Sequence, residues 1–169
     1  MEIQNIRPNV DRNHFFTLSF LLVLFCLRVS GQLLVALYQV PFLPPMQEWQ
    51  SGLLPYPVLV TCQFLIIALF AKVCCDFYNQ HGFFYEPKTA LAAPLINFGK
   101  AYFVLNSARF LIWTVVLNHV GLTGTIPIIF HFVLASFLIL VAAHHRTELA
   151  RIVVGKPLQS LSERQKVRL

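Results

Sequence analysis

Four long apolar blocks constrain the fold of this chain more than any other feature. They cover residues 15–38, 57–77, 94–117 and 125–143. Each is close to the roughly 20 residues that a helix needs to cross the hydrocarbon of a bilayer. The blocks are apolar on every face, whereas the strands of a membrane barrel alternate in polarity. The sequence therefore predicts an all-α, polytopic membrane protein that forms a four-transmembrane-helix bundle.

The composition agrees with this prediction. Hydrophobic residues make up 57% of the chain and charged residues only 12%, against about 25% charged residues in an average soluble protein. Because little of the chain lies outside the blocks, we expect a single domain over residues 1–169. The first block is not expected to be a secretory signal, since its apolar run exceeds the roughly 7 to 15 residues of a signal core.

Basic residues outside the blocks or towards their cytoplasmic ends predict the orientation, because lysine and arginine beside a membrane helix stay preferentially in the cytoplasm. Connections 39–56 and 118–124 contain none. We therefore expect both termini in the cytoplasm, with a basic tail over residues 144–169, and an inner or plasma membrane as the location. The flanking basic residues are Arg7, Arg12, Lys72, Lys88, Lys100, Arg146, Arg151, Lys156, Arg164, Lys166 and Arg168.

The net charge of +6 then serves as an orientation signal and as a contact for anionic lipid head groups. Membrane lipids are thus expected partners. A nucleic-acid partner is not expected, because the basic residues flank the spans and form no motif with aromatic residues.

Proline and glycine predict some of the helix ends. Pro94 fits the first turn of the third span. Gly155 followed by Pro157 is a stop signal for the fourth helix, which we expect to continue beyond the bilayer to that point. The first outward connection is rich in proline and apolar residues, so we expect it to lie in the interface or to fold back over the bundle.

Six polar side chains inside the blocks stand out, since a charge there costs about 3 kcal/mol even on a lenient insertion scale. They are Arg28, Gln32, Gln63, Asn106, Arg109 and His131. Side chains three or four residues apart share one face of a helix. Arg28 with Gln32, and Asn106 with Arg109, therefore form two polar stripes.

The depths of these residues predict that they meet. At about 1.5 Å per residue, Arg28 and Arg109 lie about 18 to 24 Å from the cytoplasmic ends of their spans, and Gln63 and His131 about 9 to 10 Å from the outer ends. These levels overlap in the outer half of the bilayer. A simple bundle would bring polar groups of all four spans to one buried pocket.

No carboxylate accompanies the two arginines at their depth in the blocks, since Asp76 lies at the cytoplasmic end of the second block. Of the seven acidic residues, only Glu48 lies in an outward connection, and an unpaired buried guanidinium is costly. Three arrangements would resolve this. Glu48 folds inward, or the arginines face backbone carbonyls and water, or the anion belongs to a lipid, a ligand or a partner subunit.

Metal and cofactor chemistry has little support in the sequence, and no metal site is expected. His131 is the only histidine well inside a block, so a haem would need His119 to reach inward as its second ligand. The four cysteines include no C-x-x-C pair of the kind that thiol oxidoreductases use. Neither a zinc signature nor a serine-nucleophile motif is present.

Two functions fit these observations. The first is a non-catalytic accessory or anchoring subunit of a larger membrane assembly, or a lipid-binding scaffold, because all-round apolar helices can face partner subunits as readily as lipid. The alternative is a small-molecule site in the outer half of the membrane for an anionic or carbonyl-bearing ligand, such as a lipid, a quinone or a carboxylate. The residues expected in such a binding site are Arg28, Gln32, Gln63, Asn106, Arg109 and His131, with Glu48 and Trp49 as a lid.

Overall fold

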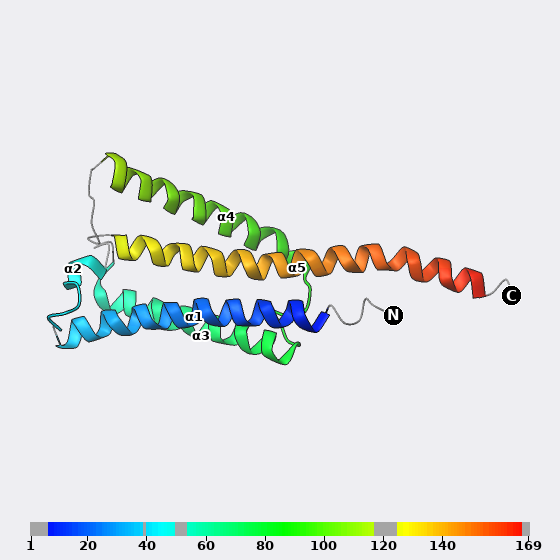
Figure 1. Cartoon of the computed structure of the whole chain (residues 1–169), viewed down its shortest axis with the longest axis horizontal. Coiled ribbons are helices and arrows are strands. Elements are labelled where there is room, and N and C mark those ends of the chain that lie inside the picture. Colours follow the sequence, from blue (N-terminus) through cyan, green and yellow to red (C-terminus); the bar gives the residue numbers. More distant parts are fainter. Residues whose placement is uncertain (1–6, 39, 50–53, 117–124, 167–169) are drawn as a thin grey trace.

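The computed structural model describes the backbone of residues 7–38, 40–49, 54–116 and 125–166, and their side chains except at residues 7–11, 47–48, 116, 125 and 151–166. Within these ranges the regular elements are all helices (Figure 1). They are α1 (Arg7–Tyr38), α2 (Met46–Trp49), α3 (Tyr56–Asn79), α4 (Thr89–Leu111), the π-helix η2 (Ile112–Val116) and α5 (Thr125–Lys166).

Three of the described helices are long and apolar enough to cross a membrane. The qualifying segments are Arg12–Tyr38, Tyr56–Asn79 and Ile126–Ala150. They indicate an integral membrane protein, as expected from the sequence. The third apolar block also forms a helix, α4, but α4 is not among the qualifying helices, because it carries polar residues such as Asn97, Lys100 and Arg109 along its length.

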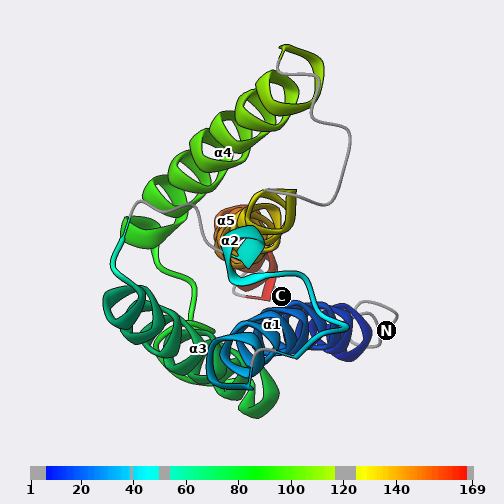
Figure 2. The same ribbon diagram turned by 90° about the vertical axis from the view of Figure 1, so that its left-hand side faces the viewer.

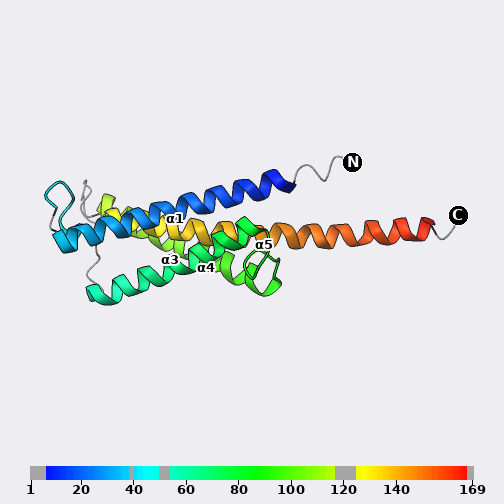
Figure 3. The ribbon, with the colours of Figure 1, turned by 90° about the horizontal axis from the view of Figure 1, so that it is seen from below.

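Two predicted helix boundaries are wrong. α4 begins at Thr89, so Pro94 lies inside the helix and not in its first turn. α5 runs for 42 residues through Gly155 and Pro157, and Figure 3 shows it projecting well beyond α1. A proline inside a helix removes one backbone hydrogen bond and strains the preceding turn, which weakens a long helix locally without ending it.

The four long helices alternate in direction, so that α1 begins and α5 ends on the same side of the molecule (Figure 1). α1 packs against α3 and α5, and α2 lies over the ends of α1 and α5. α4 packs only against α5 among the described helices, and it diverges from α5 towards its own C-terminal end (Figures 1 and 2). The helices therefore form an open arrangement with α4 at its edge.

The hydrophobic core lies between α1, α3 and α5. The rings of Phe70 and Phe137 stack across it with centroids 3.6 Å apart and an angle of 5° between their planes. All fully buried members of this cluster come from these three helices, and α4 adds only the half-buried Leu95. The fully buried members are Leu18, Phe70, Val73, Cys74, Phe77, Phe137 and Val141.

Candidate functional site

Arg28 is buried on α1 and faces the end of the short helix α2. Its Nη2 donates a hydrogen bond to the carbonyl oxygen of Trp49 over 2.8 Å, and its guanidinium lies 5.8 Å from the ring centroid of Phe130 on α5. The last carbonyls of a helix lack partners within the helix. A backbone carbonyl and an aromatic ring therefore surround the charge, which is one of the three arrangements considered from the sequence.

Trp49 folds inward and packs on α1. Its indole Nε1 donates to the carbonyl oxygen of Pro44 over 2.9 Å, and the ring is almost fully buried. The ring rests on Gly31, where an added Cβ would lie only 2.8 Å from the Trp49 ring. Because glycine has no side chain, α2 can sit close to α1 there. The side chain of the neighbouring Glu48 lies outside the described residues.

Gln32 and Gln63 join α1 to α3. Both are buried, and Gln63 Nε2 donates to Gln32 Oε1 over 2.9 Å. Buried amides that bond across helices hold membrane bundles together. Within the described part of the chain, Gln32 Nε2 and Gln63 Oε1 have no hydrogen-bond partner, so the pair uses only part of its bonding capacity.

His131 on α5 forms a hydrogen bond through Nδ1 with the hydroxyl group of Tyr102 on α4. Asn106 is buried one turn further along α4, and its Nδ2 donates to the Tyr102 carbonyl oxygen over 2.8 Å. Arg109 is exposed on the same helix. The expectation of two buried arginines therefore differs from the structure at Arg109.

The polar side chains of the spans thus make separate contacts. One joins α1 to α2, one joins α1 to α3, and one joins α4 to α5. Arg28 and Gln32 do share one buried stretch of α1, as their spacing predicted, but they face different partners. Each of these contacts is a hydrogen bond that holds two helices together, since its donor and its acceptor both belong to the protein itself.

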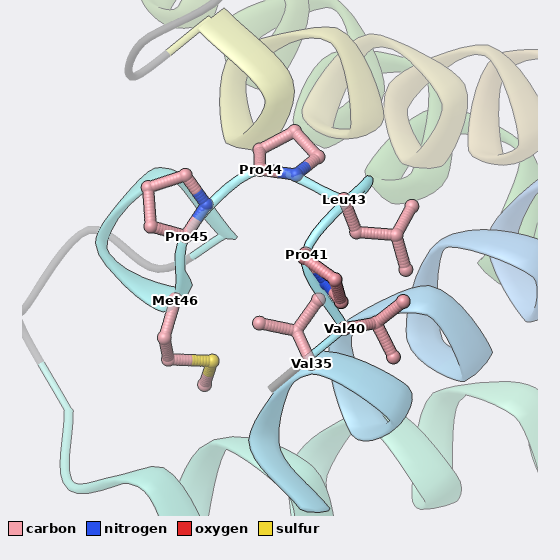
Figure 4. A pocket seen from close by; sticks show the side chains of 7 residues that line it. All are labelled: Val35, Val40, Pro41, Leu43, Pro44, Pro45 and Met46. Carbon is pink, nitrogen blue, oxygen red and sulfur yellow. The ribbon is translucent and has the colours of Figure 1, made fainter. Parts of the chain in front are cut away.

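A cavity of about 450 Å³ lies beside this region, where the end of α1 meets the proline-rich connection to α2 (Figure 4). The side chains that line it are apolar, and none of the six polar span residues contributes to it. The lining residues are Val35, Val40, Pro41, Leu43, Pro44, Pro45 and Met46.

A second polar cluster, which the sequence did not single out, lies at the opposite end of the molecule. Asp76 is buried near the end of α3, forms an ion pair with Lys72 and accepts a hydrogen bond from the Phe84 backbone N–H over 3.1 Å. Gly82 has a φ of +122°, and a Cβ there would lie 2.6 Å from the Asp76 carboxyl carbon. The carboxylate therefore organises the connection between α3 and α4. The sequence signal that could have indicated this cluster is an acidic residue near the end of an apolar block with a glycine a few residues after it.

Histidines anchor the same connection to α5. His144 Nε2 donates to the Tyr85 carbonyl oxygen over 2.9 Å, and the ring packs 4.7 Å from that of Phe77. His145 is fully buried, and neither of its ring nitrogens has a partner within the described residues.

Metal binding finds no support in the described part of the chain, where no three histidine, cysteine or acidic side chains are grouped so that they could hold an ion. The four cysteines are free thiols. His119, the histidine that a haem would require beside His131, lies outside the described residues.

Comparison with known protein families, with curated proteins and with solved structures finds no match to this chain. Its own contacts are therefore the basis for inferring what it does.

Proposed function

We propose that this chain is a non-catalytic accessory or anchoring subunit of a larger membrane assembly. We further propose that all four long helices span the bilayer, with both ends of the chain in the cytoplasm. The alternating direction of α1, α3, α4 and α5 supports this topology, as does the distribution of basic residues outside the apolar blocks.

The position of α4 is the observation that carries the proposal. α4 has a single neighbour among the described helices and is too polar to qualify as a lone span by composition. A helix in hydrocarbon that exposes polar groups is normally covered by other protein or lines a water-filled cavity. An assembly partner alongside α4 would supply that cover.

The polar contacts of the remaining helices support a structural role. Arg28, Gln63 and His131 each bond to another helix of the same chain. They stabilise the fold that presents α4. The apolar cavity beside α1 would add contact with a lipid chain.

Purification from native membranes in a mild detergent tests this proposal. We expect the chain to elute in a complex with at least one other membrane polypeptide in a fixed ratio. Recovery as a lone monomer, in detergents that preserve known assemblies of the same membrane, would contradict it. A reporter fused after residue 169 tests the topology, and it should be active only on the cytoplasmic side.

A small-molecule site at Arg28 is the second candidate, and one observation favours it. Arg28 Nε, Gln32 Nε2 and Gln63 Oε1 are buried without partners in the described part of the chain. Buried polar atoms usually have a hydrogen-bond partner, and an anionic or carbonyl-bearing ligand would provide one.

Native mass spectrometry of Arg28→Ala and Arg109→Ala variants separates the two candidates. A ligand held at the buried arginine should be lost from the Arg28 variant, whereas the exposed Arg109 would matter only if both arginines contact it. Unchanged ligand occupancy in both variants would remove the small-molecule hypothesis.

A further inference from the structure

α4 carries an exposed seam on the side away from α5. Phe98, Ala101, Leu105 and Ala108 of α4, and Ile112 at the start of η2, follow one another at alternating intervals of three and four residues, and all are exposed. This spacing is the heptad pattern by which one helix packs its side chains between those of another. We refer to these five residues as the α4 seam.

The opposite side of α4 shows what an occupied seam looks like in this protein. Ala92, Ile96, Gly99 and Asn106 are buried against α5, and a Cβ at Gly99 would lie 2.9 Å from Ile139. By the 100° step of an α-helix, this buried stripe and the α4 seam lie on roughly opposite sides. α4 therefore has one face packed on α5 and, on the other side, an exposed face with helix-packing spacing.

One cation flanks the α4 seam. Arg109 lies beside Leu105 and Ala108, is exposed and belongs to the last turn of α4. No hydrogen bond or ion pair within the described residues involves the Arg109 side chain. Arginine at a flanking position of a helix pair typically bonds a carboxylate of the facing helix.

This chain has no carboxylate close to Arg109 along the sequence. Its acidic residues are at positions 2, 11, 48, 76, 86, 148 and 163, so none lies between residues 87 and 147. Asp76 and Glu148 fall in candidate spans, but both lie within the last four residues of these spans, whereas Arg109 lies in the last turn of α4, which runs in the opposite direction. A second copy docked seam to seam would add its own Arg109 to the contact and no carboxylate beside it, so like charges would face each other in a medium of low dielectric constant. A second copy docked in this way is therefore not the occupant.

We infer that the α4 seam docks a transmembrane helix of a partner subunit that carries an aspartate or glutamate facing Arg109. The inference rests on the proposed function and specifies its interface. The small residues Ala101 and Ala108 allow the partner backbone to approach closely, while Phe98, Leu105 and Ile112 supply the area of apolar contact. The ion pair between Arg109 and the carboxylate then selects this partner over other apolar helices.

Photo-crosslinking in native membranes tests the inference, with benzoylphenylalanine placed at Leu105 and, as a control, at Leu65 on α3. These leucines are matched, since their exposed fractions are 68% and 66%. We expect Leu105 to cross-link to a transmembrane segment of another protein that contains an acidic residue, and Leu65 not to do so. Arg109→Glu should lower the yield by about tenfold, and Arg109→Lys should retain most of it.

Several results would overturn the inference. Cross-links from Leu105 to lipid alone, to a second copy of this chain, to a segment without a carboxylate, or to the same protein as Leu65 would each do so. An assembly that co-purifies with the wild-type chain but never cross-links at Leu105 refutes the seam and leaves the proposed function standing. The lack of any co-purifying protein refutes both.

Discussion

The two sides of this molecule use their polar residues differently. On one side, α1, α2, α3 and α5 are joined by buried hydrogen bonds from Arg28 and Gln63 and by the Phe70–Phe137 stack. On the other side, α4 packs only against α5 among the described helices, and its Arg109 is exposed. The difference teaches that most polar residues of these helices are satisfied by another helix of the chain, whereas Arg109 is exposed, and our proposal of a partner rests on that exposure.

The largest effect on stability is expected at Gly82, in the connection between α3 and α4 that joins the two sides of the molecule. Gly82→Ala places a Cβ 2.6 Å from the Asp76 side chain at a φ of +122°. We expect the free energy of unfolding to fall by about 3 kcal/mol, from backbone strain and steric overlap together. The measurement is denaturant unfolding in detergent micelles, followed by helical circular dichroism.

Gln80 provides a control of opposite sign for that change. It caps α3 in the left-handed conformation, with a φ of 54°, so Gln80→Gly should stabilise the protein by up to about 1 kcal/mol. Equal losses of stability in Gly82→Ala and Gln80→Gly would contradict this prediction. They would show that the connection is sensitive to substitution for a reason other than backbone strain at Gly82.

A change at the contact between Gly31 and Trp49 tests how α2 packs on α1. Gly31→Ala brings a Cβ to 2.8 Å from the Trp49 ring, and we expect a loss of about 2 kcal/mol from overpacking. Trp49 fluorescence, measured in a Trp113→Phe background, should shift to longer wavelength as the ring moves into water. Trp49→Phe makes room and should reduce the loss caused by Gly31→Ala. An unshifted spectrum with unchanged stability would contradict this packing.

A smaller effect is expected at the amide pair. Gln63→Leu removes the bond to Gln32 Oε1 and leaves a buried amide alone, which should cost about 1.5 kcal/mol. The double variant Gln32→Leu with Gln63→Leu should recover most of that loss, because both polar groups are then gone. Additive losses in the double-mutant cycle would mean that the two side chains do not act as a pair.

The smallest effect on stability is expected on the α4 seam. Leu105→Ala and Leu65→Ala both truncate exposed leucines, so each should change the free energy of unfolding of the isolated chain by less than about 0.5 kcal/mol. If Leu105→Ala alone lowered the free energy of unfolding by about 2 kcal/mol or more, the α4 seam would be part of the folded core of this chain.

Much of the fold could be predicted from the apolar blocks, because hydrophobic length and composition are local properties. The blocks that became α1, α3 and α5 qualify as spans, and the third block is helical. Two boundaries failed, at Pro94 and at Gly155–Pro157. Single prolines and glycines change the cost of a helix by a few kcal/mol at most, and neighbouring turns can outweigh them.

The candidate site was predicted less well. The spacing of Arg28 and Gln32 placed both on a buried face, and Trp49 was expected near the bundle. Their partners could not be predicted, because a shared depth does not specify which helices touch. Arg109 and Gln63 lie on helices that are not neighbours in the described structure. The Asp76 cluster was missed because its hydrogen bonds run to the backbone of a connection, which the sequence does not place.

The sequence by itself determined that this chain is helical, belongs in a membrane and carries an arginine, but no carboxylate, inside each of its first and third apolar blocks. Only the tertiary structure decided that one arginine bonds the Trp49 carbonyl oxygen while the other is exposed on a helix with an open seam. The physical reason is that hydrophobicity and helical periodicity act over a few residues, whereas the partner of a buried charge depends on how whole helices pack against one another.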